Sequence, residues 1–176
     1  MNIVAISGSL RKDSFNTKLL HAMQELAPEG ASMEVVPVAD LPLYDYDREA
    51  EYPAEAKAVK DKILAADAIV LATPEYNRSV SGVLKNAIDW VSRPYGTNAF
   101  AGKAVLVCGV SSGKIGTAVA QSHLKEIMLY LDAKVVGQPE LYLGPAKDVF
   151  NDDGSLKEES TKELLRNALE TLKARA

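Results

Sequence analysis

Apolar runs of strand length alternate along this chain with segments whose apolar residues recur at helical spacing. Residues 3–6, 69–72 and 105–110 are almost continuously apolar, as is typical of central parallel strands buried on both faces. Residues 33–38 include a glutamate and a proline, which suits an edge strand. The alternation predicts an α/β protein with a three-layer, doubly wound fold around a parallel sheet.

Helical periodicity fills the intervals between these runs. Ser14 is the predicted N-cap of a first helix, and Pro53 a first-turn residue of a second. A third helix carries one apolar face from residue 80 to residue 91. Ser155 and Glu158 form a capping-box pattern that predicts the start of the last helix.

The apolar residues of the fourth helix, over about residues 116–131, cover a sector too wide to be buried against a single neighbouring surface. Leu129 lies on the far side of this helix. Scattered surface hydrophobes are common, but a subunit interface also explains this width. A fifth strand lies within residues 134–143 and is broken near residues 137–139. Because no repeat or linker interrupts residues 1–176, we expect one domain.

Composition narrows the possible partners. The chain has 20 Lys and Arg and 24 Asp and Glu, a net charge of −4, so it lacks the basic field that nucleic acid or an anionic membrane requires. No apolar run approaches the ~20 residues of a membrane span, and the N-terminus has no signal-peptide pattern, which predicts a cytoplasmic protein. The one cysteine, Cys108, lies in an apolar run and is expected to be buried and inert; no metal site is expected.

Polar loops follow three of the predicted strands, over residues 7–16, 73–79 and 111–116. Ligands of open parallel sheets bind beyond the carboxyl ends of the strands, where the strand order reverses. We therefore expect these three loops to form one site. None of them carries the glycine pattern of a dinucleotide-binding fold or of a P-loop nucleotide hydrolase.

The loop of residues 7–16, called the phosphate loop below, predicts an anion site. It leads into a helix N-terminus, whose free N–H groups and dipole attract anions, and Arg11 offers a planar fork for phosphate oxygens. Ser9, Ser14 and Asn16 add neutral donors. The alternative is an ordinary polar loop in which Ser14 only caps the helix.

The loop of residues 73–79 contains Pro74, which fixes one φ angle, and Tyr76, which supplies an aromatic ring. The backbone of Glu75, Tyr76 and Asn77 could face the polar edge of a flat heterocycle such as an isoalloxazine ring. Taken alone, the same residues are also compatible with a surface turn.

The segments GSLRKDSFN (residues 8–16), TPEYNRSVSGVLKNAIDWVSRP (73–94) and SSGKIGTAVAQSHL (111–124) closely resemble the NAD(P)H-dependent FMN reductase family. This family includes bacterial quinone and chromate reductases and some azoreductases. The resemblance implies a flavodoxin-like fold of strand order 2-1-3-4-5, non-covalent FMN, NADPH or NADH as electron donor, and a homodimer or homotetramer.

Transferred by motif position, the resemblance also implies roles for individual residues. The FMN phosphate and ribityl chain are expected on Ser9, Arg11, Ser14, Phe15 and Asn16. The isoalloxazine ring is expected between Pro74, Glu75, Tyr76 and Asn77 on one side and Ser111, Ser112 and Gly113 on the other. Many relatives have an aromatic residue or histidine at the position of Arg78, which is a candidate substrate-binding residue here, with a solvated arginine as the alternative.

These observations predict an FMN-dependent oxidoreductase that passes two electrons from NAD(P)H to a small-molecule acceptor by a ping-pong mechanism. Quinones are the expected acceptors, with chromate, azo compounds and free flavin as others. FMN carries the chemistry, so no side chain is given a catalytic role, and His21 and His123 are expected to serve packing or an interface. A flavodoxin-like electron carrier and a non-redox binding module are the alternatives.

Overall fold

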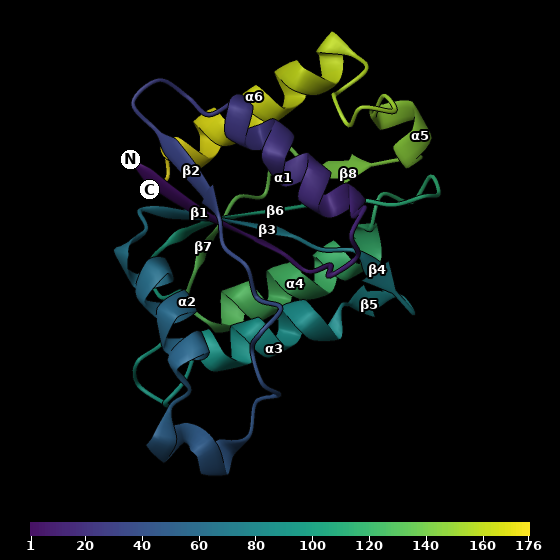
Figure 1. Cartoon of the computed structure of the whole chain (residues 1–176). Helices are drawn as coiled ribbons and strands as arrows, with labels where there is room; N and C mark the ends of the chain where they lie inside the picture. The colour runs from purple at the N-terminus through teal and green to yellow at the C-terminus, as the bar shows by residue number, and fades with distance from the viewer.

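The computed structural model describes all 176 residues and shows a parallel sheet between two layers of helices (Figure 1). The sheet runs in the order β2 (Ser32–Val35), β1 (Asn2–Ser7), β3 (Ala68–Ala72), β6 (Ala104–Val110) and β7 (Lys134–Val135), with β8 (Leu141–Leu143) also paired to β6. Every neighbouring pair is parallel. Taken as halves of one interrupted strand, β7 and β8 give the flavodoxin-like order 2-1-3-4-5, with β2 at the edge as predicted.

Helices cover both faces of the sheet (Figure 1). One face is covered by α1 (Phe15–Glu25) and α6 (Glu159–Lys173), and the other by α2 (Ala54–Ala65), α3 (Gly82–Val91) and α4 (Ala118–Tyr130). Successive strand residues point to opposite faces, so Ile3 and Ala5 join the first apolar core while Val4 and Ile6 join the second. The sheet is therefore buried on both faces, which explains its apolar strands.

Ser14 caps α1 as predicted: its Oγ accepts the N–H of Thr17 at 3.2 Å, a contact that stabilises a helix by about 1 kcal/mol. Pro53 is the N-cap residue of α2 and not part of its first turn. The predicted third helix is shorter at its start, because Val80 belongs to a strand and α3 begins at Gly82.

The predicted capping box of the last helix is wrong. Glu158 is the N-cap of α6 and its side chain makes no capping hydrogen bond. Ser155 lies instead in a turn, where its Oγ donates to Asp153 Oδ1 at 2.7 Å. This turn is closed by an antiparallel bridge between Phe150 and Leu156, which keeps Ser155 away from the helix.

Three short elements have no counterpart in the prediction. The hairpin of β4 (Glu75–Tyr76) and β5 (Ser79–Val80) occupies the second loop, α5 (Ala146–Val149) follows β8, and the 3-10 helix η1 (Tyr46–Glu51) precedes α2. All are too short to show a hydrophobic period. None of the helices combines the length and the apolar character needed to cross a membrane.

Candidate active site

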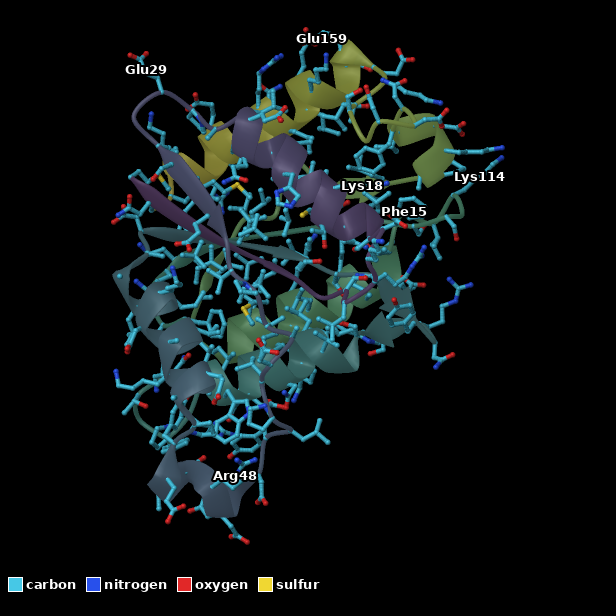
Figure 2. The ribbon with its side chains drawn as sticks, in the orientation of Figure 1. Phe15, Lys18, Glu29, Arg48, Lys114 and Glu159 are labelled. Atoms are coloured by element: carbon cyan, nitrogen blue, oxygen red, sulfur yellow. The ribbon has the colours of Figure 1, made fainter.

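The carboxyl ends of β1, β3 and β6 meet at a cavity of about 110 Å³. Figure 2 shows Phe15 and Lys114 at this end of the molecule, whereas Arg48 lies far from it. Ligand pockets commonly measure roughly 300–1,000 Å³, so this cavity is small and has room for only a phosphate-sized part of a larger ligand. Eleven residues line the cavity: Ser9, Arg11, Ser14, Phe15, Asn16, Pro74, Glu75, Tyr76, Val110, Ser111 and Ser112.

All of these residues except Val110 belong to the set predicted to bind the cofactor. Asn77 and Gly113, also in that set, do not line the cavity. Asn77 stands at the tip of the hairpin, and Gly113 at the outer part of the third loop, where a Cβ atom would meet nothing within 4 Å. Ten of the twelve residues predicted to bind the cofactor therefore line one cavity, and their role in binding FMN stays a prediction.

The phosphate loop presents donors to the cavity. Helix geometry leaves the N–H groups of Phe15 and Asn16, in the first turn of α1, without an intrahelical acceptor. The Arg11 guanidinium is exposed and lies 5.6 Å from the centroid of the Phe15 ring, a cation–π arrangement beside this helix end. The positive end of α1, two free N–H groups and a guanidinium thus converge on one place, which suits a phosphate dianion.

Asn16 has a structural task as well. Its Nδ2 donates to the carbonyl oxygen of Val110 at 3.2 Å, and its Oδ1 accepts the N–H of Val110 at 3.0 Å. These two buried bonds fasten the start of α1 to the end of β6 and close the floor of the cavity. The carboxamide is therefore largely committed to the fold.

The hairpin forms the opposite wall. Glu75 pairs with Val80, and Tyr76 with Ser79, so the loop between the strands is the two-residue turn Asn77-Arg78. Both turn residues have positive φ, 51° and 62°, as a type I′ turn requires. Glycine is preferred at such positions, so an arginine there carries backbone strain of roughly 1–3 kcal/mol.

Glu75 does not offer its side chain to the cavity. Its Oε2 accepts the N–H groups of Val119 and Ala120 at 3.0 and 3.2 Å, and its Oε1 accepts a hydrogen bond from Arg78 Nη1 at 2.9 Å. The Glu75 side chain is only 6% exposed, whereas that of Arg78 is 67% exposed. The carboxylate thus caps the N-terminus of α4, and only the backbone of Glu75 remains for a ligand.

The third loop is held by its own backbone. Ser111 Oγ donates to the carbonyl oxygen of Gly113 at 2.8 Å and accepts the N–H of Gly116 at 3.0 Å. Gly116 passes so close to β8 that a Cβ atom would stand 2.4 Å from the carbonyl carbon of Tyr142. A side chain at position 116 would therefore displace β8 or the loop.

Two residues outside the predicted set help to build the site. Ser81 Oγ is buried between α3 and the phosphate loop, and its position before a helical pattern was an available N-cap signal. Gln121 is fully buried, and its Nε2 donates to the carbonyl oxygens of Gly116 and Leu141 and to Thr117 Oγ1. In the sequence, Gln121 was marked only as a single amide side chain among the apolar residues of α4.

The cysteine and the two histidines of the chain lie away from the lining of the cavity. Cys108 is buried as predicted, and desolvation raises the pKa of its thiol to about 12. His123 lies beside the hairpin, with Nδ1 3.1 Å from Ser79 Oγ, and His21 contacts Gln24 on the outer face of α1. No group of three or more His, Cys, Asp or Glu side chains is arranged to hold a metal ion.

The fold and the site together define a flavodoxin-like protein in which the N-terminus of α1 lies where the strand order reverses, between β1 and β3. Residues 1–148 match the family model described as NADPH-dependent FMN reductase. The chain belongs to the NADPH-dependent FMN reductase family.

Individual relatives agree with this assignment. The chain is 43% identical over 170 residues to a 2-hydroxy-1,4-benzoquinone reductase of Burkholderia sp, covering 97% of this chain and 93% of the relative. It is 40% identical over 173 residues to an NAD(P)H-dependent FMN reductase of Pseudomonas aeruginosa, covering 98% and 93%. Among solved structures, the flavoenzyme NAD(P)H:(acceptor) oxidoreductase FerB of Paracoccus denitrificans superposes with a TM-score of 0.90 at 38% identity, covering 99% of this chain and 98% of that one.

Proposed function

We propose that this protein uses FMN to pass two electrons from NADPH or NADH to quinones. The observation that carries the proposal is the cavity in which the first turn of α1, with Arg11, faces the hairpin. Family membership supports FMN and NAD(P)H, and the names of the relatives support a quinone as acceptor.

The residues present fit FMN. The cavity exposes donors but no free carboxylate, because both oxygens of Glu75 are already engaged. Ser9, Arg11, Ser14 and the N–H groups of Phe15 and Asn16 would hold the phosphate. The backbone from Pro74 to Tyr76 would face the ring, and Ser111 and Ser112 its other flank.

Bound FMN supplies a ring that accepts a hydride and afterwards gives up two electrons. The protein's part is to bind, orient and partly shield it. Because the cavity is too small to enclose the ring, the ring of bound FMN would lie at the rim formed by the hairpin and the third loop, where donor and acceptor could reach it in turn. This arrangement favours a ping-pong mechanism without a catalytic side chain.

Arg78 is the residue that we propose to meet the anionic donor. Its guanidinium is largely exposed at the hairpin tip, where its bond to Glu75 leaves further N–H groups free. We expect Arg78→Ala to raise the KM for NADPH more than the KM for an uncharged quinone. Equal changes in both constants would assign Arg78 to the turn alone.

The test is a spectrum followed by steady-state kinetics. Purified protein should carry FMN or bind it stoichiometrically, and should oxidise NADPH with a quinone acceptor. Double-reciprocal plots should be parallel, with quinone inhibiting competitively against NADPH at high concentration. Bound FMN without turnover would favour an electron carrier, intersecting plots would indicate two sites, and no affinity for FMN would favour a non-redox binding module.

We also propose that the chain forms a homodimer or homotetramer through α3 and α4. A hollow of about 580 Å³ runs between these helices, lined by both apolar and charged side chains. Leu129 and Tyr130 on α4 are 63% and 78% exposed, although leucine and tyrosine are costly to leave in water. The single-domain organisation, the cytoplasmic location and the absence of a nucleic-acid partner stay predictions.

A further inference from the structure

We infer that Glu75 is a positioning residue: its carboxylate fastens the hairpin to the N-terminus of α4 and so fixes the backbone that faces the flavin ring. The inference rests on the proposed function, because it presumes that FMN binds in this cavity. It assigns Glu75 a task that neither the cavity lining nor the motif implied.

The first step is that α4 has no cap of its own. Its N-cap residue, Thr117, has a left-handed φ of 62° and makes no capping hydrogen bond with its side chain. The first N–H groups of a helix need acceptors from outside it. Glu75 supplies one carboxylate oxygen to the N–H groups of both Val119 and Ala120, from a segment more than forty positions earlier in the chain.

The second step concerns charge. A carboxylate that is only 6% exposed is costly unless it is paired and hydrogen-bonded. Here it receives two helix N–H groups, the positive end of the α4 dipole, and the Arg78 guanidinium. All these contacts depend on one position of the carboxylate, so they fix the hairpin relative to α4.

The third step is that the Glu75 carboxylate makes most of the side-chain hydrogen bonds that hold the hairpin. Its strands have two residues each, and an isolated hairpin of that size is at best marginally stable. The other side-chain bonds to neighbouring elements are those of Ser79 with His123, on the exposed surface, and of Ser81 with Gly8, below the hairpin. Val80 packs against the second apolar core and so holds β5, whereas on β4 the Glu75 carboxylate supplies the side-chain hydrogen bonds that orient the backbone.

The consequence is a specific pattern of ligand affinity. Because the hairpin faces the ring and not the phosphate, Glu75→Ala should raise the Kd for FMN and for riboflavin by the same factor, roughly twofold to thirtyfold, as expected for a lost helix cap. Arg11→Ala, in contrast, should raise the Kd for FMN alone. A general loss of folding would lower the fraction of protein that binds, without this pattern in the affinities.

The experiment compares Glu75→Ala and Glu75→Gln with Glu55→Gln, a matched change of an exposed first-turn glutamate on α2. Hydrogen exchange of the Val119 and Ala120 amides is measured in flavin-free protein, and titrations with FMN and riboflavin follow, with the absorption band of the bound flavin. Glu75→Ala should speed exchange of both amides by about tenfold or more and shift the band. Glu75→Gln keeps one acceptor oxygen and should show smaller changes of the same kind, and Glu55→Gln none.

The outcomes distinguish a failure of the proposed FMN-dependent function from a failure of the positioning role of Glu75. If wild-type protein binds neither flavin, the proposed function fails, while the exchange data still show whether Glu75 caps α4. If wild-type protein binds FMN but Glu75→Ala leaves both Kd values and the band unchanged, the function stands and the positioning role is wrong. Should Glu75→Ala fail to fold, Glu75→Gln decides by the same measurements.

Discussion

Ser81 donates a hydrogen bond from its Oγ to the carbonyl oxygen of Gly8 at 2.7 Å, joining the start of α3 to the end of β1. The same oxygen accepts the N–H of Leu84 at 3.2 Å, so one buried hydroxyl also caps α3. A Cβ atom at Gly8 would stand 2.8 Å from Ser81 Oγ. The phosphate loop can therefore approach α3 this closely only because residue 8 has no side chain.

Ser81→Ala should lower the free energy of unfolding by roughly 1–3 kcal/mol, because it removes a helix cap and leaves the Gly8 carbonyl without its partner. Urea unfolding of the flavin-free protein measures this change. Ser160→Ala, at an exposed position in the first turn of α6, is the control and should change stability by less than about 0.5 kcal/mol. Equal stability of Ser81→Ala and wild type would show that the buried bond contributes little.

Arg11→Ala should weaken FMN binding by roughly tenfold to a hundredfold, since a hydrogen bond to a charged group contributes about 1.5–3 kcal/mol. The Kd for riboflavin, which lacks the phosphate, should hardly change. Flavin fluorescence titration measures both constants, and Lys12→Ala tests whether any neighbouring cation has this effect. An unchanged Kd for FMN would leave Arg11 as a solvated residue stacked on Phe15.

The elements that the sequence predicts correctly are those with strong local signals. The apolar strands, the N-cap at Ser14 and the interrupted fifth strand are each encoded in a few consecutive residues. The capping box at Ser155 failed because a side chain that can cap a helix can equally close a turn, and Asp153 lies nearer. The hairpin was missed because its turn contains no glycine and its strands are too short for an alternating pattern.

Leu129→Lys should weaken assembly more than it weakens the fold, because this side chain is already 63% exposed in the isolated subunit. Sedimentation at micromolar concentration gives the mass of the assembly, and urea unfolding gives the stability. Leu64→Lys, at a leucine on α2 that is 51% exposed, is the matched control and should leave the mass unchanged. Wild-type protein that sediments as a single chain would remove the interface from the proposal.

Cys108 should make stability fall at high pH. Burial raises the pKa of its thiol from 9.0 to about 12, so between these values the unfolded chain releases a proton that the folded chain keeps. The stability that the folded protein gains from keeping this proton is fully present below about pH 9 and is lost as the pH rises toward about 12. Urea unfolding between about pH 8 and pH 10 should therefore show a steeper decline for wild type than for Cys108→Ala; identical slopes would contradict the raised pKa.

At the candidate site, too, the sequence predicts the residues that have a local signal and misses the contacts that join distant segments. Arg11 and Ser9 could be placed from the sequence because a strand, a loop and a helix N-terminus follow one another directly. The role of Glu75 could not, because its partners Val119 and Ala120 contribute only backbone N–H groups, and no residue type marks them. Contacts between a side chain and a distant backbone leave no local pattern.

The turn Asn77-Arg78 has a consequence for how the protein's selectivity can change. Glycine would relax the backbone at position 78, and the arginine side chain is mostly in water, so the core sets no requirement for what stands there. Exchanges at this position alter the rim that an incoming molecule meets, and they also remove the guanidinium that pairs with the Glu75 carboxylate beside α4. Position 78 is thus a place where a mutant library can change the preference for a charged electron donor, while the Glu75 carboxylate still keeps the N–H groups of Val119 and Ala120.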